Sequence, residues 1–520
     1  MRHIPVSPAP QSSTQGKSPS SGIKDDSMSL LHGALTRRKP IQTVPPAGEE
    51  KTGEETHGLR RVLSGFDLIL LGVGTTIGAG LFSLTGVAAA QNAGPAVILA
   101  FAIAAVACGF AGLCYAELAA MIPVAGSAYS YVYATLGELT AWIIGWDLVL
   151  EYTVGAATVA VSWSGYLTSV FAGWGLPLDP RWTASPFTTI TLPDGTHAHA
   201  ILNVPAILAV WLITALLVRG ISESAKVNAV VVALKLGVVA AVIIFCTPYI
   251  DTANYHPFLP PNTGQFGQFG FSGVMRAAGM VFFAYLGFDI VSTTAQETKN
   301  PARALPVGIL GSLVICTLIY IAFSAVLTGV VSYKTMIDDS SPVATAIDHT
   351  HRIWLQNAVK ISVLLGYVSV LLGLMLGQVR VFYTMARDGL LPALFGRLNP
   401  RSRTPVVSHL IFAVLTCALA GTTPIAVLGS MTSIGTLLAF VLVCVGVAVL
   451  QRRDPDRPRP FRVPGGPIIP VLGTLSCLAV MASLDRLTWI RLIVWLALGM
   501  IIYRVYGYRR SHLATGKTQP

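Results

Sequence analysis

The stretch GVGTTIGAGLF, residues 72–82, lies inside a segment that is otherwise apolar enough to cross a membrane. It holds Gly72, Gly74, Gly78 and Gly80, although glycine costs about 1 kcal/mol relative to alanine inside a helix. Glycines in a membrane helix either let a neighbouring helix pack closely or let the backbone open around a small ligand. We interpret the first two as packing positions. The last two are expected where the helix breaks and its backbone receives a ligand.

The composition is that of a polytopic α-helical membrane protein. Of 520 residues, 53% are hydrophobic and only 11% are charged, whereas about 25% are charged in soluble domains. Apolar runs of about 20 residues recur after residue 65, and each is long enough to cross a bilayer. These runs do not alternate in hydropathy, which argues against a β-barrel. The net charge of +11 lies largely in segments flanking the helices, so we expect no nucleic-acid partner.

The apolar runs predict about twelve spans. They cover residues 66–91, 95–120, 138–171, 200–218, 227–247, 271–295, 304–331, 356–385, 405–421, 424–450, 468–484 and 488–506. The sequence GTTP, residues 421–424, must form a very tight turn between spans 9 and 10. Residues 1–56 are rich in Ser, Pro, Gly and Lys and are expected to be a disordered tail without a cleaved signal peptide.

Basic residues gather in alternate connections between the spans. They are Arg219, Lys226, Lys299, Arg303, Arg387, Arg397, Arg401, Arg403, Arg452, Arg453, Arg457, Arg459, Arg462, Arg509 and Arg510. The opposite connections are poor in positive charge, with Arg181 alone in 172–199 and none in 249–270. The positive-inside rule therefore predicts that both termini are cytoplasmic.

Other candidate sites are weak. The seven cysteines fall in apolar runs, where they are expected to serve as small packing residues. His197 and His199 form an HxH pair without a third ligand nearby in the sequence. No signature of a hydrolase, a P-loop or a kinase is present. We therefore expect no enzyme activity, catalytic residue, metal or cofactor.

Span 6 contains a second interruption, at Gly287 and Asp289. Spans 1 and 6 are the first members of two successive groups of five spans. Interruptions at corresponding places in two halves point to a transporter site near the midplane. The sequence shows no residue-level similarity between the halves, so this inference rests on position alone.

Charged residues inside spans are costly and therefore informative. Lys235 lies about two turns inside span 5, and Asp147 and Glu151 share a face of span 3 because they are four residues apart. Lys235 either pairs with an acid to hold the bundle together or gains and loses a proton. Two roles are left open for Asp147: it forms hydrogen bonds at a helix end, or it takes part in function. Glu117 and Arg276 are expected to be ordinary interfacial charges and are not counted in the site.

Several motifs together resemble the cationic amino acid transporter family of the amino acid–polyamine–organocation superfamily. They are LGVGTTIGAGLFSLTG, NAGPAVILAF, AGLCYAELAAMIPVAGSAYSYVYATLGELTAWIIGWDLVLEY, RGISESAKVN, FFAYLGFDIVSTTAQETKNPARALP and LGQVRVFYTMARDGLLP. The resemblance runs from about Leu59 to Arg510. It implies an all-α LeuT-type fold with spans 1 and 6 broken: a ten-helix core over 57–450, with inverted repeats 66–247 and 271–450. Two additional helices over 451–510 and a cytoplasmic tail, 511–520, complete it.

The resemblance also implies roles for individual residues. Those that match the family's substrate-binding positions are Thr76, Gly78, Ala79, Gly80, Phe283, Ala284 and Leu286. Those that match its proton-coupling and pathway positions are Lys235, Asp289 and Glu151. Some bacterial relatives have a threonine where this chain has Ala79, so one side-chain contact with the substrate is in doubt.

The sequence thus predicts a secondary active transporter in the plasma or inner cell membrane, taking up cationic or small neutral amino acids with protons. The facing part of span 8, VSVLLGLMLGQ (residues 368–378), is bulky and apolar and favours small neutral substrates. The alternatives are a polyamine or cationic amino acid exchanger without proton coupling and a transport-dead amino acid sensor. The expected partners are the amino acid, protons and lipid, and a monomer is favoured with an oligomer left open.

Overall fold

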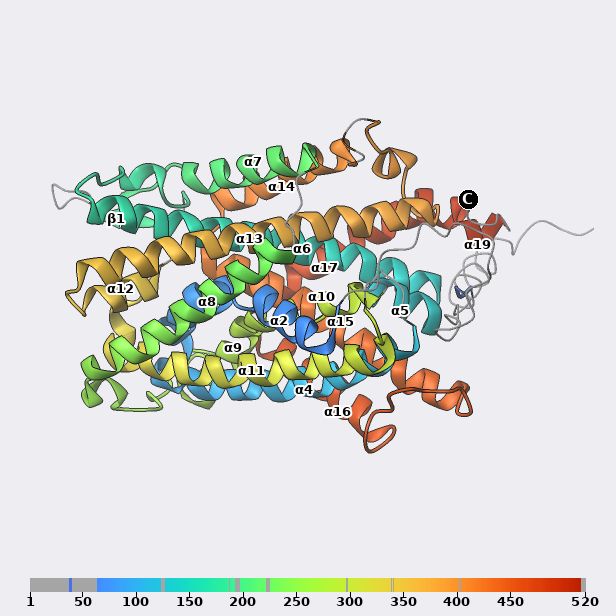
Figure 1. Ribbon diagram of the computed structural model, residues 1–520, viewed down its shortest axis with the longest axis horizontal. Coiled ribbons are helices and arrows are strands. Elements are labelled where there is room, and N and C mark those ends of the chain that lie inside the picture. Colours follow the sequence, from blue (N-terminus) through green and yellow to red (C-terminus); the bar gives the residue numbers. More distant parts are fainter. Residues whose placement is uncertain are drawn as a thin grey trace, which may run out of the picture.

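The computed structural model is an almost entirely helical bundle (Figure 1). It describes residues 37–39, 63–122, 127–186, 188–191, 197–220, 225–295, 298–337, 339, 341–400, 402 and 404–515. The predicted tail, residues 1–56, lies outside the described residues except for Arg37–Lys39, and so do residues 516–520 of the second predicted tail. Arg37–Lys39 and the last helix lie at the same end of the bundle, called the terminal end below.

Each predicted span corresponds to one helix or to two half-helices. The bounds are α2 (Gly65–Thr76) with α3 (Thr85–Ala88), α4 (Val97–Met121), α6 (Glu138–Gly173), α7 (Val204–Val218), α8 (Ala225–Cys246), α9 (Gly270–Val281) with α10 (Ile290–Thr293), α11 (Pro301–Val330), α13 (Ile353–Arg387), α14 (Val406–Thr422), α15 (Ile425–Arg453), α16 (Ile468–Ser483) and α17 (Arg486–Ile502). Within the described residues, eight helical stretches are long and apolar enough to cross a membrane, and four more apolar helices are shorter.

Short elements join these helices. They are α5 (Ser127–Thr135), α12 (Pro342–Asp348), α18 (Tyr508–Arg510), α19 (His512–Thr515) and the antiparallel pair β1 (Thr189–Thr191) and β2 (His197–His199). Local signals fix several boundaries. The Ser64 hydroxyl caps α2, and the Asp67 carboxylate accepts back from the Ser64 N–H at 2.8 Å. The predicted tight turn is confirmed, because only Thr423 and Pro424 separate α14 from α15.

Helix α6 lies at the centre and packs against α13, α15, α7 and α14, while α11 packs against α4 and α2. Small residues permit close approach. A Cβ on Gly72 would lie 2.5 Å from the Ser312 hydroxyl, and one on Gly74 would lie 2.1 Å from a Val232 methyl. The packing interpretation of these two glycines is confirmed. All seven cysteines are buried free thiols, as expected of packing residues.

Arg37–Lys39 dock on the terminal end. The Lys39 ammonium lies 3.0 Å from the Asp388 carboxylate, and an Arg37 guanidinium nitrogen lies 3.8 Å from Glu138. The Glu138 N–H donates to the Arg37 carbonyl at 2.9 Å. Three residues of the predicted tail are therefore held against the start of α6 and the end of α13.

The expectation that Glu117 is an ordinary interfacial charge is wrong, because its side chain is 0% exposed. It lies 3.3 Å from the Nε of Arg459, which is 4% exposed, and it accepts from the Val463 N–H at 2.8 Å. The connection between α15 and α16 is thus fastened to the end of α4 by a buried ion pair.

Replacing Glu117 by alanine should strongly destabilise the protein. The buried Arg459 would keep its charge without a carboxylate, at a cost of about 3–5 kcal/mol. Asp454→Ala is the matched control, because the Asp454–Arg457 pair is long and partly exposed and worth under about 1 kcal/mol. Thermal unfolding in detergent measures both. Equal melting temperatures for the two variants would contradict the assignment.

Candidate functional site

Span 1 is broken in its middle. Helix α2 ends at Thr76, and Ile77 is extended, with φ −74° and ψ 108°. Helical structure resumes with the π-helical turn η1 (Gly80–Leu84). Among the described residues, no acceptor receives the N–H groups of Gly78, Ala79 or Gly80. These are the free donors that every helix start exposes.

Span 6 is broken at a similar depth. Helix α9 continues into the 3₁₀ turn η7 (Phe282–Tyr285), after which Leu286 is extended. Gly287 has φ +124°, a conformation that glycine tolerates and other residues rarely adopt. The Phe283 carbonyl accepts from the Leu286 N–H at 3.0 Å. Within the described chain, the Leu286 carbonyl receives no donor.

The two breaks pack directly against each other. A Cβ on Gly80 would lie 2.3 Å from the Ala284 Cα, and one on Gly287 would lie 2.9 Å from the Thr75 carbonyl. The Thr75 hydroxyl donates to the Gly287 carbonyl at 3.0 Å. Backbone touches backbone here, so both glycines are required by contact, and Gly287 is required by its conformation as well.

Tyr320 of α11 links the breaks from behind. Its hydroxyl lies 2.7 Å from the Ala284 carbonyl and 3.0 Å from the Thr76 carbonyl. No sequence pattern marks this residue as functional, because a tyrosine in an apolar span is most often a packing residue. Its role depends on two carbonyls that are far away in the chain.

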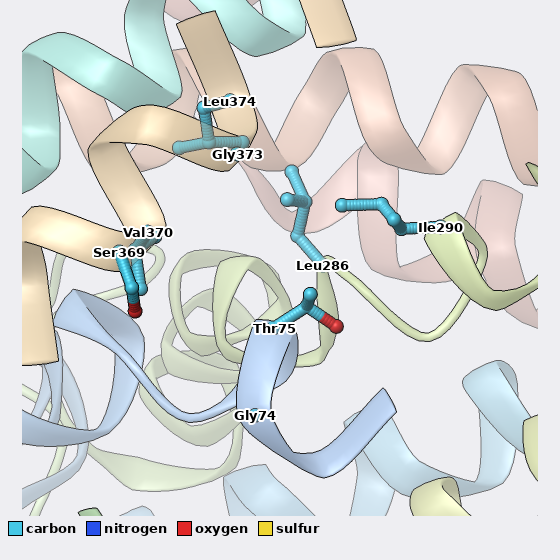
Figure 2. A pocket seen from close by; sticks show the side chains of 8 residues that line it. All are labelled: Gly74, Thr75, Leu286, Ile290, Ser369, Val370, Gly373 and Leu374. Atoms are coloured by element: carbon cyan, nitrogen blue, oxygen red, sulfur yellow. The ribbon is translucent and has the colours of Figure 1, made fainter. Parts of the chain in front are cut away.

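Two adjoining cavities lie beside the breaks. The first has a volume of about 30 Å³ (Figure 2) and is lined by Gly74, Thr75, Leu286, Ile290, Ser369, Val370, Gly373 and Leu374. The second has a volume of about 10 Å³ and is lined by Thr75, Thr76, Gly78, Ala79, Gly80, Phe283, Leu286, Val370 and Leu374. These volumes leave room for only one or a few water molecules. An amino acid can therefore bind only if the walls move apart.

The predicted substrate-binding residues are brought together. Six of them line the second cavity, and Ala284 lies just behind it, against Gly80. The sequence did not single out Thr75, Val370 or Leu374 individually. Val370 and Leu374 belong to the span 8 stretch that was expected to face the site, and their spacing of four places them on one face of α13.

Lys235 is 2% exposed and belongs to α8, which packs against α2. Its ammonium donates to the Gly74 carbonyl at 2.8 Å. Its aliphatic stem passes Gly366 of α13, where an added Cβ would lie 3.1 Å from the Lys235 Cε. The side chain therefore connects spans 5, 1 and 8.

The acids lie near the span 6 break. Asp289 is 3% exposed and accepts from the Gly287 N–H at 3.2 Å. Glu151 of α6 lies close enough to Asp289 and to Asp147 for their charges to interact. A helix-end role for Asp147 is wrong, because it lies about two and a half turns inside α6.

The predicted HxH pair occupies β2, opposite β1. In the part of the chain that the structure describes, no group of three or more His, Cys, Asp or Glu side chains is placed to hold a metal ion.

Comparison of the sequence with known proteins identifies the family that it matches. Residues 63–503 match the family described as "Amino acid permease". The chain is 42% identical over 483 residues to the branched-chain amino acid permease BcaP of Bacillus subtilis, covering 93% of this chain and 100% of the relative. It is 39% identical to the methylthioribose transporter of the same organism, covering 92% and 99%. It is 38% identical to the vacuolar cationic amino acid transporter 4 of Arabidopsis thaliana, covering 81% and 68%.

Gly80→Ala should abolish uptake of labelled leucine into proteoliposomes. Its methyl group would force apart the two breaks at the Ala284 backbone, an overpacking that costs about 1–3 kcal/mol. Gly78→Ala should keep measurable uptake, because its methyl group would lie 3.3 Å from a Val370 methyl that can turn away. Gly109→Ala, with nothing within 4 Å, is the control. Uptake by Gly80→Ala at the rate of this control would refute the contact.

Proposed function

The chain belongs to the amino acid permease family, a family of transporters and not of enzymes, and we propose that it is a secondary active amino acid transporter working by alternating access. The proposed fold is the LeuT type, with inverted repeats over 66–247 and 271–450 and two further helices over 451–510. The breaks in the first span of each proposed repeat support this assignment.

One observation carries the proposal: residues whose backbone donors, and one whose backbone acceptor, have no partner among the described residues line the same cavity. The N–H groups of Gly78–Gly80 lie at a helix start, which attracts a carboxylate through its donors and the helix dipole. The Leu286 carbonyl at the other break is suited to an ammonium group. A zwitterion binding between them satisfies both sets without any charged side chain. A polyamine has no carboxylate and would leave the N–H groups unused.

We propose a neutral aliphatic amino acid as the substrate. Leu286, Ile290, Val370 and Leu374 line the first cavity, and none of the described residues that line either cavity is charged. A cationic side chain would lose its hydration there without a partner. The printed name of the Bacillus subtilis relative, a branched-chain amino acid permease, supports the same class.

We propose that uptake is coupled to protons through Lys235. The protonated amine donates to the Gly74 carbonyl and holds α8 against α2. The neutral amine holds that carbonyl more weakly, so protonation favours one of the two access states. Asp289 and Glu151 are the proposed acids beside the pathway.

The proposed location is the cell membrane with the terminal end in the cytoplasm. The excess of Arg and Lys in the connections at that end supports this orientation.

Ile290 and Ser369 are half-buried and Gly373 is exposed, so the first cavity reaches the surface of the bundle beside α10 and α13.

Purified protein in proteoliposomes should take up leucine, isoleucine and valine and should exclude arginine and putrescine. The measurement is accumulation of each labelled compound under an inward proton gradient, with methylthioribose as a further compound. Preferential uptake of arginine would contradict the apolar side-chain site. Uptake of methylthioribose alone would contradict the role of the N–H groups.

Lys235→Ala should lose gradient-driven accumulation while keeping exchange of leucine at equal pH. The control is Lys360→Ala, which removes a lysine of α13 that is similarly buried but pairs with Asp348 at 2.7 Å. The control variant should still accumulate substrate. Accumulation by Lys235→Ala at the wild-type level would disprove coupling through this residue.

A further inference from the structure

Asp147 of α6 is a fully buried acid that the proposed mechanism has not used. Its side chain is 0% exposed, and among the described residues neither carboxylate oxygen has a hydrogen-bond partner. An ionised carboxylate in that setting would lose its hydration without compensation. The resting side chain must therefore carry a proton.

Glu138 on the same helix shows the opposite arrangement. It is also 0% exposed, but it accepts from the hydroxyls of Ser511 at 2.6 Å and Tyr503 at 2.9 Å, and Arg37 lies 3.8 Å away. Its charge is compensated, whereas that of Asp147 would not be. The two acids differ in their partners and not in their burial.

Asp147 also lies at the right place for proton movement. Glu151 follows one turn later on the same face of α6, and both face Gly435 of α15. A Cβ on Gly435 would lie 3.2 Å from an Asp147 oxygen and 3.7 Å from the Glu151 Cβ. Glycine thus leaves the space beside both acids open.

The row of acids ends at the substrate site. Glu151 lies close to Asp289, which accepts from Gly287 at the span 6 break. The titratable groups around the row come from α4, α5 and α6 and are Tyr115, Tyr131 and Tyr152. The α15 side contributes the hydroxyl of Thr436 beside Glu151. Because α6 begins at the terminal end, Asp147 lies nearer to that end than Glu151 does.

We propose that Asp147 is a proton-carrying residue of this transporter and the first station between the terminal end and the substrate site. Its O–H bond breaks as an O–H bond forms on the Glu151 carboxylate, directly or through one water. Glu151 then passes a proton to Asp289. The carboxylate left on Asp147 takes a new proton from water at the terminal end. This inference rests on the proposed proton-coupled transport.

The first test compares Asp147→Asn with the wild type in proteoliposomes. Gradient-driven accumulation of labelled leucine should fall at least about tenfold, while leucine exchange at equal pH continues, because the neutral amide keeps the shape of the neutral acid. Asp147→Glu should restore accumulation. Glu138→Gln is the matched control and should keep the ratio of accumulation to exchange, whatever it does to stability.

The second test needs no transport. Infrared spectroscopy of the purified protein at neutral pH should show the C=O stretch of a protonated carboxylic acid, and Asp147→Asn should reduce it. An unchanged band in this variant would overturn the protonation of Asp147. Full accumulation by Asp147→Asn, or equal loss of accumulation and exchange, would overturn its role in coupling. If leucine accumulation by the wild-type protein does not depend on the proton gradient, the result refutes the proposed function instead.

Discussion

The structure depends on how two interrupted helices satisfy their backbone at membrane depth, where an unpaired polar group has no water to bind. The protein supplies donors for the carbonyls: Lys235 for Gly74, Thr75 for Gly287, and Tyr320 for Thr76 or Ala284. Among its described residues, it supplies no matching acceptors for the N–H groups at the start of η1. The remaining need is therefore for an acceptor, and a carboxylate is the ligand that meets it best.

In the proposed mechanism, binding and coupling use separate groups. The cavities are lined by glycines, by apolar side chains and by the uncharged polar residues Thr75, Thr76 and Ser369, and Lys235, Asp289 and Glu151 are not among the lining residues. Lys235 of α8 contacts α2 at Gly74, and Asp289 lies at the span 6 break beside Gly287. A neutral cavity lets the substrate bring its own two charges, which the helix ends then compensate. A change in the protonation of Lys235 or Asp289 can thus alter the packing of the surrounding helices without removing a group that binds the substrate directly.

Much of this arrangement could be predicted from local sequence features. Hydropathy gave the spans, and glycines with a buried acid marked the breaks, because membrane helices carry such residues only for a reason. The features that could not be predicted involve residues whose partners are distant in the chain. The pairing of Glu117 with Arg459 and the bridging role of Tyr320 leave no periodic signal. Gly80 was expected to receive the ligand, and the structure adds that it must also admit the Ala284 backbone.

The same contacts indicate which wall moves when a substrate enters. The two breaks touch backbone to backbone, at Gly80 with Ala284 and at Gly287 with Thr75, so they shift most easily as one unit. Helix α13 meets them through the side chains of Val370 and Leu374, which can withdraw. In the proposed alternating access, the cavity is therefore expected to enlarge by separation of α13 from the breaks. Lys235 spans that boundary, with its ammonium on the Gly74 carbonyl and its stem against Gly366. A proton on this amine acts at the interface that must open.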